Sequence, residues 1–226
     1  MLTLRVRRFF ILLLLAALPA LAASNDAASK VEAYAKKDFI AQFGESGIKG
    51  DVVKIEHFGS HFGSFFMVLT IDTNSEGRKL MYLDDDANNQ SIYAYGLMEK
   101  QGKLQQIWTF KDFNSRFYKP RFYIDKSTMR DDNADGNPEC IVAYFGASNQ
   151  KAQPLRVITY FNGLRYAATD YYPLSKGGKV QHEYDANWKR LPKPTQLHVK
   201  NLLKSLKPLD FDALELEDMA SQSSPK

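Results

Sequence analysis

Cysteine is almost absent from this sequence of 226 residues, because Cys140 is the only one. A single thiol excludes an intramolecular disulfide, so the stability of the fold must come from its apolar core and from any metal that it binds. Cys140 begins the apolar run CIVAYF. This position favours a buried thiol on a strand over a reactive nucleophile.

Long apolar runs are also missing after the first residues, and no later segment reaches membrane-spanning length. The N-terminal stretch MLTLRVRRFFILLLLAALPALAA combines early arginines, an apolar run over residues 9–18 and a small-x-small pattern at Ala20 and Ala22, which places cleavage near Ala22/Ala23. This pattern is typical of a secretory signal peptide over residues 1–23. No cysteine lies near the expected cleavage site to carry a lipid. We therefore expect a periplasmic or secreted protein without a membrane span after cleavage.

A large excess of either charge is absent once this segment is removed. The full chain has 30 Lys+Arg and 26 Asp+Glu, and three of the arginines lie in the signal peptide. The mature chain therefore carries 27 basic and 26 acidic residues, a net charge near +1. Binding to nucleic acid relies on clustered basic residues that neutralise phosphates. The sequence predicts no nucleic-acid partner.

Short β-branched and aromatic runs, separated by turn residues, occupy most of residues 51–172. They predict about nine strands, namely VVKIEHF, SFFMVLTI, KLMYL, SIYAYGLM, LQQIWTF, RFYI, ECIVAYF, LRVITYF and LRYAATDYY. Alternation in SIYAYGLM predicts half-exposed faces and hence an antiparallel sheet, and Asn162-Gly163 predicts a tight hairpin. The expected fold is mainly β, an antiparallel, sandwich-like single domain.

One helix is expected on each side of the strands. Apolar spacing predicts an N-terminal helix over about residues 29–43 and a C-terminal helix over about residues 195–206, with Thr195 as its N-cap. The domain then spans residues 24–207. The last segment, residues 208–226, contains five acids and few apolar residues, which predicts a flexible acidic tail.

The stretch DDNADGNPEC, residues 131–140, places oxygen-bearing side chains at alternate positions around one glycine. Counted from the first aspartate, positions one, three, five, seven and nine are Asp131, Asn133, Asp135, Asn137 and Glu139. Calcium takes about six to eight oxygen ligands, and a glycine at position six permits the sharp turn. Position twelve is a valine, so the loop is not an EF-hand. It resembles the DxDxDG calcium loops of integrin-type repeats and predicts one structural calcium site; the alternative is a polar turn.

Two further polar stretches carry weaker metal hypotheses. HFGSHFGS, residues 57–64, sets His57 and His61 four residues apart, a spacing that suits zinc on a helix. The two glycines and the strand-like flanks favour a β-turn-β element instead, so the histidine metal site remains an alternative. LDDDANNQS, residues 83–91, lacks the glycine and is expected to be a polar turn.

We find no nucleophile elbow, zincin helix or cysteine-histidine motif in a credible context. Glu183 beside His182, or Glu56 beside His57, could form an acid/base pair, but such neighbours are common on protein surfaces. Catalysis is therefore less favoured than binding.

Five blocks resemble, in the same order, small exported bacterial proteins labelled as surface-polysaccharide biosynthesis proteins. They are GDVVKIEHFGSHFGSFFMVLT, SIYAYGLM, LQQIWTFKDF, MRDDNADGNPECIVAY and PLRVITYFNGLRYAATD. The resemblance covers roughly residues 50–190, with the aspartate-rich loop as its central block. Members of this group tend to carry cysteines on both sides of the loop, whereas this chain has only Cys140.

The resemblance implies a periplasmic, β-rich binding or accessory protein in envelope or surface-polysaccharide biology. Its partner would be an envelope glycan or another periplasmic protein. Two alternatives stay open. One is a hydrolase or lyase that acts on glycans through paired carboxylates. The other is a protein-protein adaptor or inhibitor, which would show an exposed apolar patch or an unpaired sheet edge.

Overall fold

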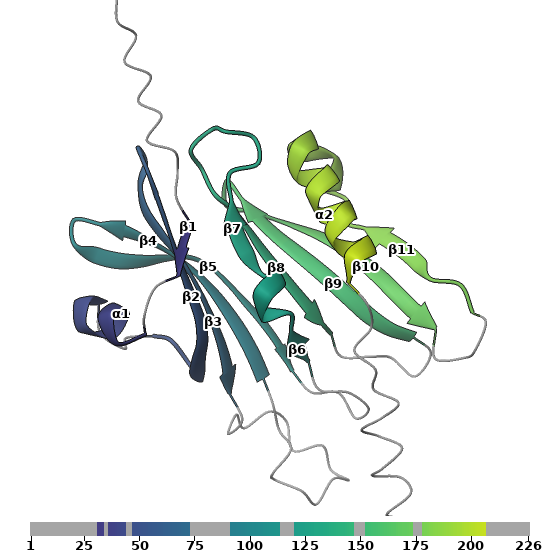
Figure 1. Cartoon of the computed structure of the whole chain (residues 1–226), viewed down its shortest axis with the longest axis horizontal. Coiled ribbons are helices and arrows are strands. Elements are labelled where there is room, and N and C mark those ends of the chain that lie inside the picture. The colour runs from purple at the N-terminus through teal and green to yellow at the C-terminus, as the bar shows by residue number, and fades with distance from the viewer. Residues whose placement is uncertain are drawn as a thin grey trace, which may run out of the picture.

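The computed structural model describes seven segments of the chain, residues 31–33, 36–43, 47–72, 91–113, 120–146, 152–173 and 178–206. They form two antiparallel sheets and two α-helices, one near each end of the chain (Figure 1). The prediction of a mainly β, antiparallel fold is confirmed. Neither described helix has the length and apolar character needed to cross a bilayer.

The first sheet pairs its strands in chain order. It contains β1 (Val31–Ala33), β2 (Asp51–Ser60), β3 (Gly63–Asp72), β4 (Ser91–Lys100) and β5 (Lys103–Phe113). All its pairings are antiparallel. β5 lies at one edge, and β4 is the only strand that pairs with it among the described residues.

The second sheet has the order β11-β10-β9-β8-β6, and β7 also pairs with β8. Its strands are β6 (Arg121–Phe122), β7 (Thr128–Arg130), β8 (Glu139–Phe145), β9 (Ala152–Phe161), β10 (Leu164–Pro173) and β11 (Gln181–Tyr184). The acidic loop, residues 131–138, connects β7 to β8. The predicted Asn162-Gly163 hairpin is confirmed, because Phe161 pairs with Leu164 and both turn residues have positive φ, 49° and 73°.

The two sheets pack face to face across one apolar core. The first sheet contributes Phe58, Met67, Leu69, Ile92 and Phe110, and the second contributes Met129, Cys140, Val142, Tyr144 and Ile158. Helix α1 (Lys36–Phe43) covers the outer face of the first sheet, and α2 (Lys193–Ser205) covers that of the second (Figure 1). The result is a helix-sheet-sheet-helix sandwich, in which β8 is buried along its whole length.

The burial of β4 corrects the sequence interpretation. Alternation predicted one exposed face for this strand, but all residues from Ser91 to Leu97 are buried. Tyr93 and Tyr95 pack outward in a cluster with Phe39 of α1, while Ile92 packs inward against the other sheet. The alternation of side chains in β4 therefore distinguishes two buried faces, because helix α1 covers the outer face of this sheet.

Both helix starts also differ from the prediction. The N-terminal helix begins at Lys36 because Val31–Ala33 pair with β2 as a short strand. The C-terminal helix begins at Lys193 after Pro192, so Thr195 lies inside its first turn and is not the N-cap. Short β7 and β11 were not predicted either, since three or four residues carry little periodic signal.

Several predicted segments lie outside the described residues. They are the signal peptide (residues 1–23), the strand KLMYL (residues 79–83), residues 83–90 of the second acidic cluster and the tail 208–226.

Candidate functional site

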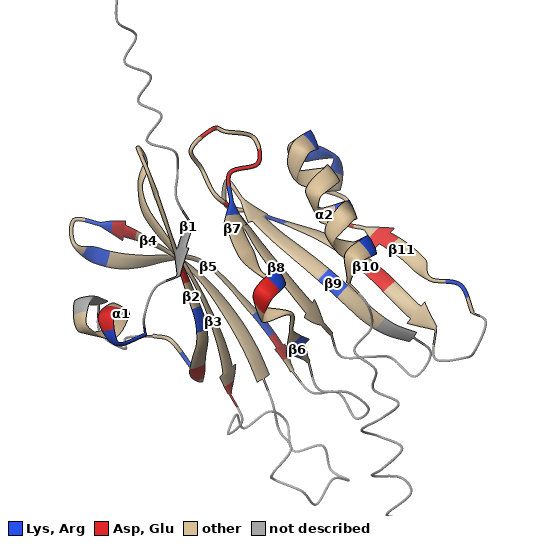
Figure 2. Ribbon diagram, in the orientation of Figure 1, with Lys and Arg blue, Asp and Glu red and all other residues tan. Residues whose placement is uncertain are grey.

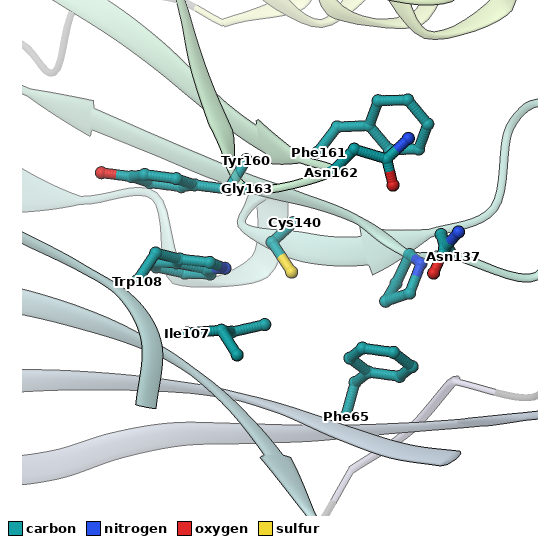
Figure 3. Close-up of a pocket in the computed structure, with 10 residues that line it drawn as sticks. Phe65, Ile107, Trp108, Asn137, Cys140, Tyr160, Phe161, Asn162 and Gly163 are labelled. Carbon is teal, nitrogen blue, oxygen red and sulfur yellow. The ribbon is translucent and has the colours of Figure 1, made fainter. Parts of the chain in front are cut away.

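A pocket of about 340 Å³ opens between the sheets beside the acidic loop. Strands β3, β5, β8 and β9, the acidic loop and the β9–β10 turn all contribute to its wall (Figure 3). The lining residues are Phe65, Ile107, Trp108, Asn137, Pro138, Cys140, Tyr160, Phe161, Asn162 and Gly163. The wall is thus mostly apolar and aromatic, with two amide side chains, as is usual for ligand pockets.

A β-bulge in β5 shapes one side of the pocket. Gly96 pairs with Trp108, but the next residue, Leu97, pairs with Gln106, so Ile107 is the extra residue. Neighbours in a regular strand point to opposite faces, whereas Ile107 and Trp108 both line the pocket. Ile107 remains 47% exposed.

Trp108 is held by contacts on both sheets. Its ring stacks on Tyr160 with the centroids 4.0 Å apart and an interplanar angle of 1°. It also lies against Gly96, where a Cβ atom would collide with the indole. The nitrogen-bearing edge of the indole points toward Cys140 (Figure 3). The pocket therefore has a fixed aromatic wall with one N–H donor.

Cys140 contributes its sulfur to the pocket wall. The residue is 4% exposed, as its apolar surroundings predicted. Burial raises the pKa of the thiol far above its ordinary value, and the nearby charges of Glu56 and Glu139 raise it further. A neutral thiol is a poor nucleophile. Cys140 therefore serves the pocket as a small apolar group.

The side chains of the acidic loop fold back onto the loop's own backbone. Asp131 accepts the N–H groups of Asp135 and Gly136 through its two carboxylate oxygens, each at 3.0 Å. Asn133 Oδ1 also accepts the Asp135 N–H, at 3.0 Å, and Asp135 Oδ1 accepts the Asn137 N–H, at 2.8 Å. Positions one, three and five therefore gather around one short stretch of backbone. Figure 2 shows the acids of this loop in red.

Glu139, the predicted ligand at position nine, is engaged at the junction between the loop and α2. Its Oε2 accepts the Asp132 N–H at 2.9 Å, and its Oε1 accepts the Thr195 hydroxyl at 2.9 Å. The side chain is fully buried, at 0% exposure. In the part of the chain that the structure describes, no group of three or more His, Cys, Asp or Glu side chains is placed to hold a metal ion. The structure thus gathers Asp131, Asn133 and Asp135 without adding Glu139.

This junction contains polar residues that the loop pattern did not indicate. Arg130 Nε donates to Asp132 Oδ1 at 2.7 Å, while Asp132 Oδ2 is buried without a hydrogen-bond partner. Burial lowers the pKa of His198 on α2, against the opposing effect of the Asp132 charge. Asp132 stands at position two, which is not a calcium position, so the loop pattern gives no sign of it. The sequence predicts Thr195 as an N-cap, whereas its hydroxyl donates to Glu139.

The two histidines of HFGSHFGS lie in different surroundings. His57 is on β2 and packs on Phe66, with ring centroids 4.9 Å apart. His61 is in the β2–β3 turn, where its ring is tilted against that of Phe62 with the centroids 3.9 Å apart. It also lies against Gly136, which has no room for a side chain. His61 therefore packs the β2–β3 turn against the acidic loop, next to Asn137 of the pocket.

Neither of the two neighbouring pairs in the sequence, Glu56 with His57 or Glu183 with His182, interacts as an acid/base pair. Glu56 is bound to Lys54 at 2.8 Å and accepts the Met129 N–H at 2.7 Å, which ties β2 to β7. His182 Nδ1 lies 2.7 Å from Asp170 Oδ1 rather than beside Glu183. The interactions of Glu56 join the two sheets, and those of His182 join two neighbouring strands.

Because Glu139 is buried, we expect the stability of the protein to fall as the pH rises. Burial raises the pKa of Glu139 from 4.5 to about 7, with a further contribution from the Asp132 charge. The folded state then binds a proton that the unfolded state releases, so the stabilisation is complete below about pH 4.5 and is lost as the pH rises through about 7. The full effect is about 3 kcal/mol.

Thermal melts in chelator between about pH 5 and 8 test this expectation. Tm of the wild type should fall across this range more steeply than that of Glu139→Gln, which keeps the neutral form at every pH. Parallel curves for the two proteins would show that Glu139 titrates normally.

Comparison with known proteins finds no relative of this chain. No family model matches it, and no match is found among curated proteins or solved structures.

Proposed function

We propose that the chain is an exported, non-catalytic binding protein that acts as an accessory in envelope or surface-polysaccharide biology. Its ligand enters the pocket between the sheets. The observation that carries this proposal is the pocket itself, with a volume of about 340 Å³ and a wall of aromatic and aliphatic side chains with two amides. Such a composition suits recognition, because the apolar wall supplies affinity and a few polar groups supply orientation.

The lining of the pocket favours binding over glycan hydrolysis. A glycoside hydrolase needs two carboxyl groups about 5 to 10 Å apart across its cleft. The described residues that line this pocket include no Asp or Glu, and burial keeps the Cys140 thiol neutral. The lining thus offers contacts for a ligand without an evident acid and base.

We further propose that calcium stabilises the acidic loop. Its ligands would be Asp131, Asn133, Asp135 and the backbone carbonyl of Asn137, which are oxygen donors of the kind that calcium prefers. The side chains at positions one, three and five already gather through their bonds to the loop backbone. The fit is partial, because both oxygens of Glu139 accept other hydrogen bonds.

Asn137 would couple the metal to the ligand. Its backbone N–H is held by Asp135, and its side chain lines the pocket. A cation that fixes Asp135 would therefore also fix one wall of the pocket, without touching the ligand itself. The calcium loop would then have a structural role in binding.

Calcium should raise the Tm of the wild type by several degrees, measured in chelator and in millimolar calcium. Preferential binding to the folded state stabilises it by about 1.4 kcal/mol when free calcium is about tenfold above its dissociation constant. Asp135→Ala should abolish this response, since it removes a ligand. Asp125→Ala removes an exposed acid outside the loop and should keep it. A response of the same size in Asp135→Ala would exclude this loop as the site.

The binding role is tested in a strain from which the gene is deleted. The wild-type gene should restore the yield of surface polysaccharide, and Ile107→Glu should not, because it places a charge in the apolar wall of the pocket. The matched control is Leu197→Glu on α2, where an apolar residue that is 61% exposed lies outside the pocket lining. Full restoration by Ile107→Glu would contradict the proposal. So would the release of reducing ends from the polysaccharide by the purified protein, which would indicate a hydrolase.

A further inference from the structure

β5 is the longest edge strand among the described residues, and β4 is the only described strand that pairs with it. It has 11 residues, whereas the strands at the other sheet edges, β1, β6, β7 and β11, have two to four. Folded proteins usually keep such edges short or covered, because the unpaired N–H and C=O groups of a long edge bind further strands. Most side chains of β5 are exposed, including Ile107 at 47% and Phe113 at 44%. This edge has the properties of a docking site for an extended chain.

The pocket lies directly beside this edge. The bulge in β5 turns Ile107 and Trp108 into the pocket wall, so the pocket and the edge share two residues. When a peptide adds to a sheet edge, backbone hydrogen bonds supply affinity and adjacent pockets that receive alternate side chains supply specificity. The arrangement therefore fits a strand that places one side chain in the pocket of Figure 3.

Hydrogen bonds at the far end of β5 limit where a strand can add. The Phe113 N–H donates to the carboxylate of Asp112 at 2.8 Å. The Thr109 carbonyl accepts from the Tyr160 hydroxyl at 3.4 Å. These two backbone groups already have partners, which leaves the stretch from Lys103 to the bulge at Ile107 as the docking segment.

Exposed basic side chains lie on and beside this segment. Lys103 and Arg165 are both exposed, one on β5 itself and one on β10 next to the pocket turn. The acid on β5, Asp112, is paired with Arg156 at 3.3 Å and lies at the far end of the strand. On β4, half-buried Glu99 pairs with Leu104, and exposed Lys100 pairs with Lys103. The exposed side chains Lys100, Lys103 and Arg165 outnumber this one acid, so the net charge around the docking segment is positive and complements an acidic chain.

We propose that the ligand of this site is an extended segment of a partner protein that adds to β5 as an antiparallel strand. One apolar side chain of the segment enters the pocket, and flanking acidic residues face Lys103 and Arg165. This inference rests on the proposed function, because it names the ligand class of the same pocket.

A synthetic peptide tests the inference on the full mature chain. The probe is a fluorescein-labelled peptide of about nine residues that alternates aspartate with leucine and carries one central phenylalanine, and binding is followed by fluorescence anisotropy. We expect saturable binding that Ile107→Glu and Lys103→Glu each weaken by about tenfold or more. Leu197→Glu should bind like the wild type. Absence of saturable binding to the wild type would overturn the inference.

Two N-methylated peptides separate strand addition from simple insertion of a side chain. The N–H groups of a strand point alternately to its two sides, so only one alternate set faces β5. Methylation of that set should weaken binding by about tenfold or more, whereas methylation of the other set should have little effect. Equal affinity of the two peptides would overturn strand addition.

The outcomes distinguish this inference from the proposed function. If Ile107→Glu fails to restore polysaccharide yield in cells but the peptide does not bind, the binding role stands and the peptide inference is wrong. The inference is equally wrong if surface oligosaccharides bind the pocket and displace the peptide, since the ligand is then a glycan. If Ile107→Glu restores the yield fully, the pocket has no role in cells and both proposals fall.

Discussion

The complete burial of β8 is the constraint on which the rest of the structure depends. Its alternate residues pack into two cores, Cys140, Val142 and Tyr144 between the sheets and Ile141, Ala143 and Phe145 beneath α2. A strand enclosed on both faces cannot shift by one residue without exchanging the two sets of side chains. The register of β8 therefore fixes where the acidic loop ends, and it places Glu139 at 0% exposure at the start of the strand.

The burial of Glu139 connects the local loop to the tertiary fold. Its carboxylate is enclosed, and its two hydrogen bonds, from Asp132 and Thr195, join the loop to a helix more than fifty residues away in sequence. The loop is thus held from both directions, by its own side-chain bonds around Asp135 and by the anchor on α2. A loop that is held in this way suits a wall of a binding pocket, because little conformational entropy is then lost when a ligand binds.

The acidic loop was predictable from the sequence because its chemistry is local. Asp131, Asn133 and Asp135 accept hydrogen bonds from backbone groups only two to five residues away. Their spacing in the sequence is therefore enough to predict that these side chains gather around the loop. The pocket was not predictable in this way, since Phe65, Ile107 and Phe161 are brought together by the pairing of distant strands. The bulge at Ile107 carries no sequence signal, because it arises from the registers of β4 and β5. The spacing of the histidines suits zinc on a helix, and the structure places His57 on a strand and His61 in a turn.

By itself the sequence determined the mainly β, antiparallel class, the hairpin at Asn162-Gly163 and the buried state of Cys140. These properties follow from local periodicity, turn chemistry and apolar context, each of which acts over a few residues. Only the tertiary structure decided that β4 is buried on both faces, that Glu139 anchors the loop to α2 and that β5 is an open edge beside a pocket. The physical reason is that the helix covering a sheet face, and the strand beside another strand, come from distant parts of the chain. Which of them pack together is decided by the free energy of the whole fold.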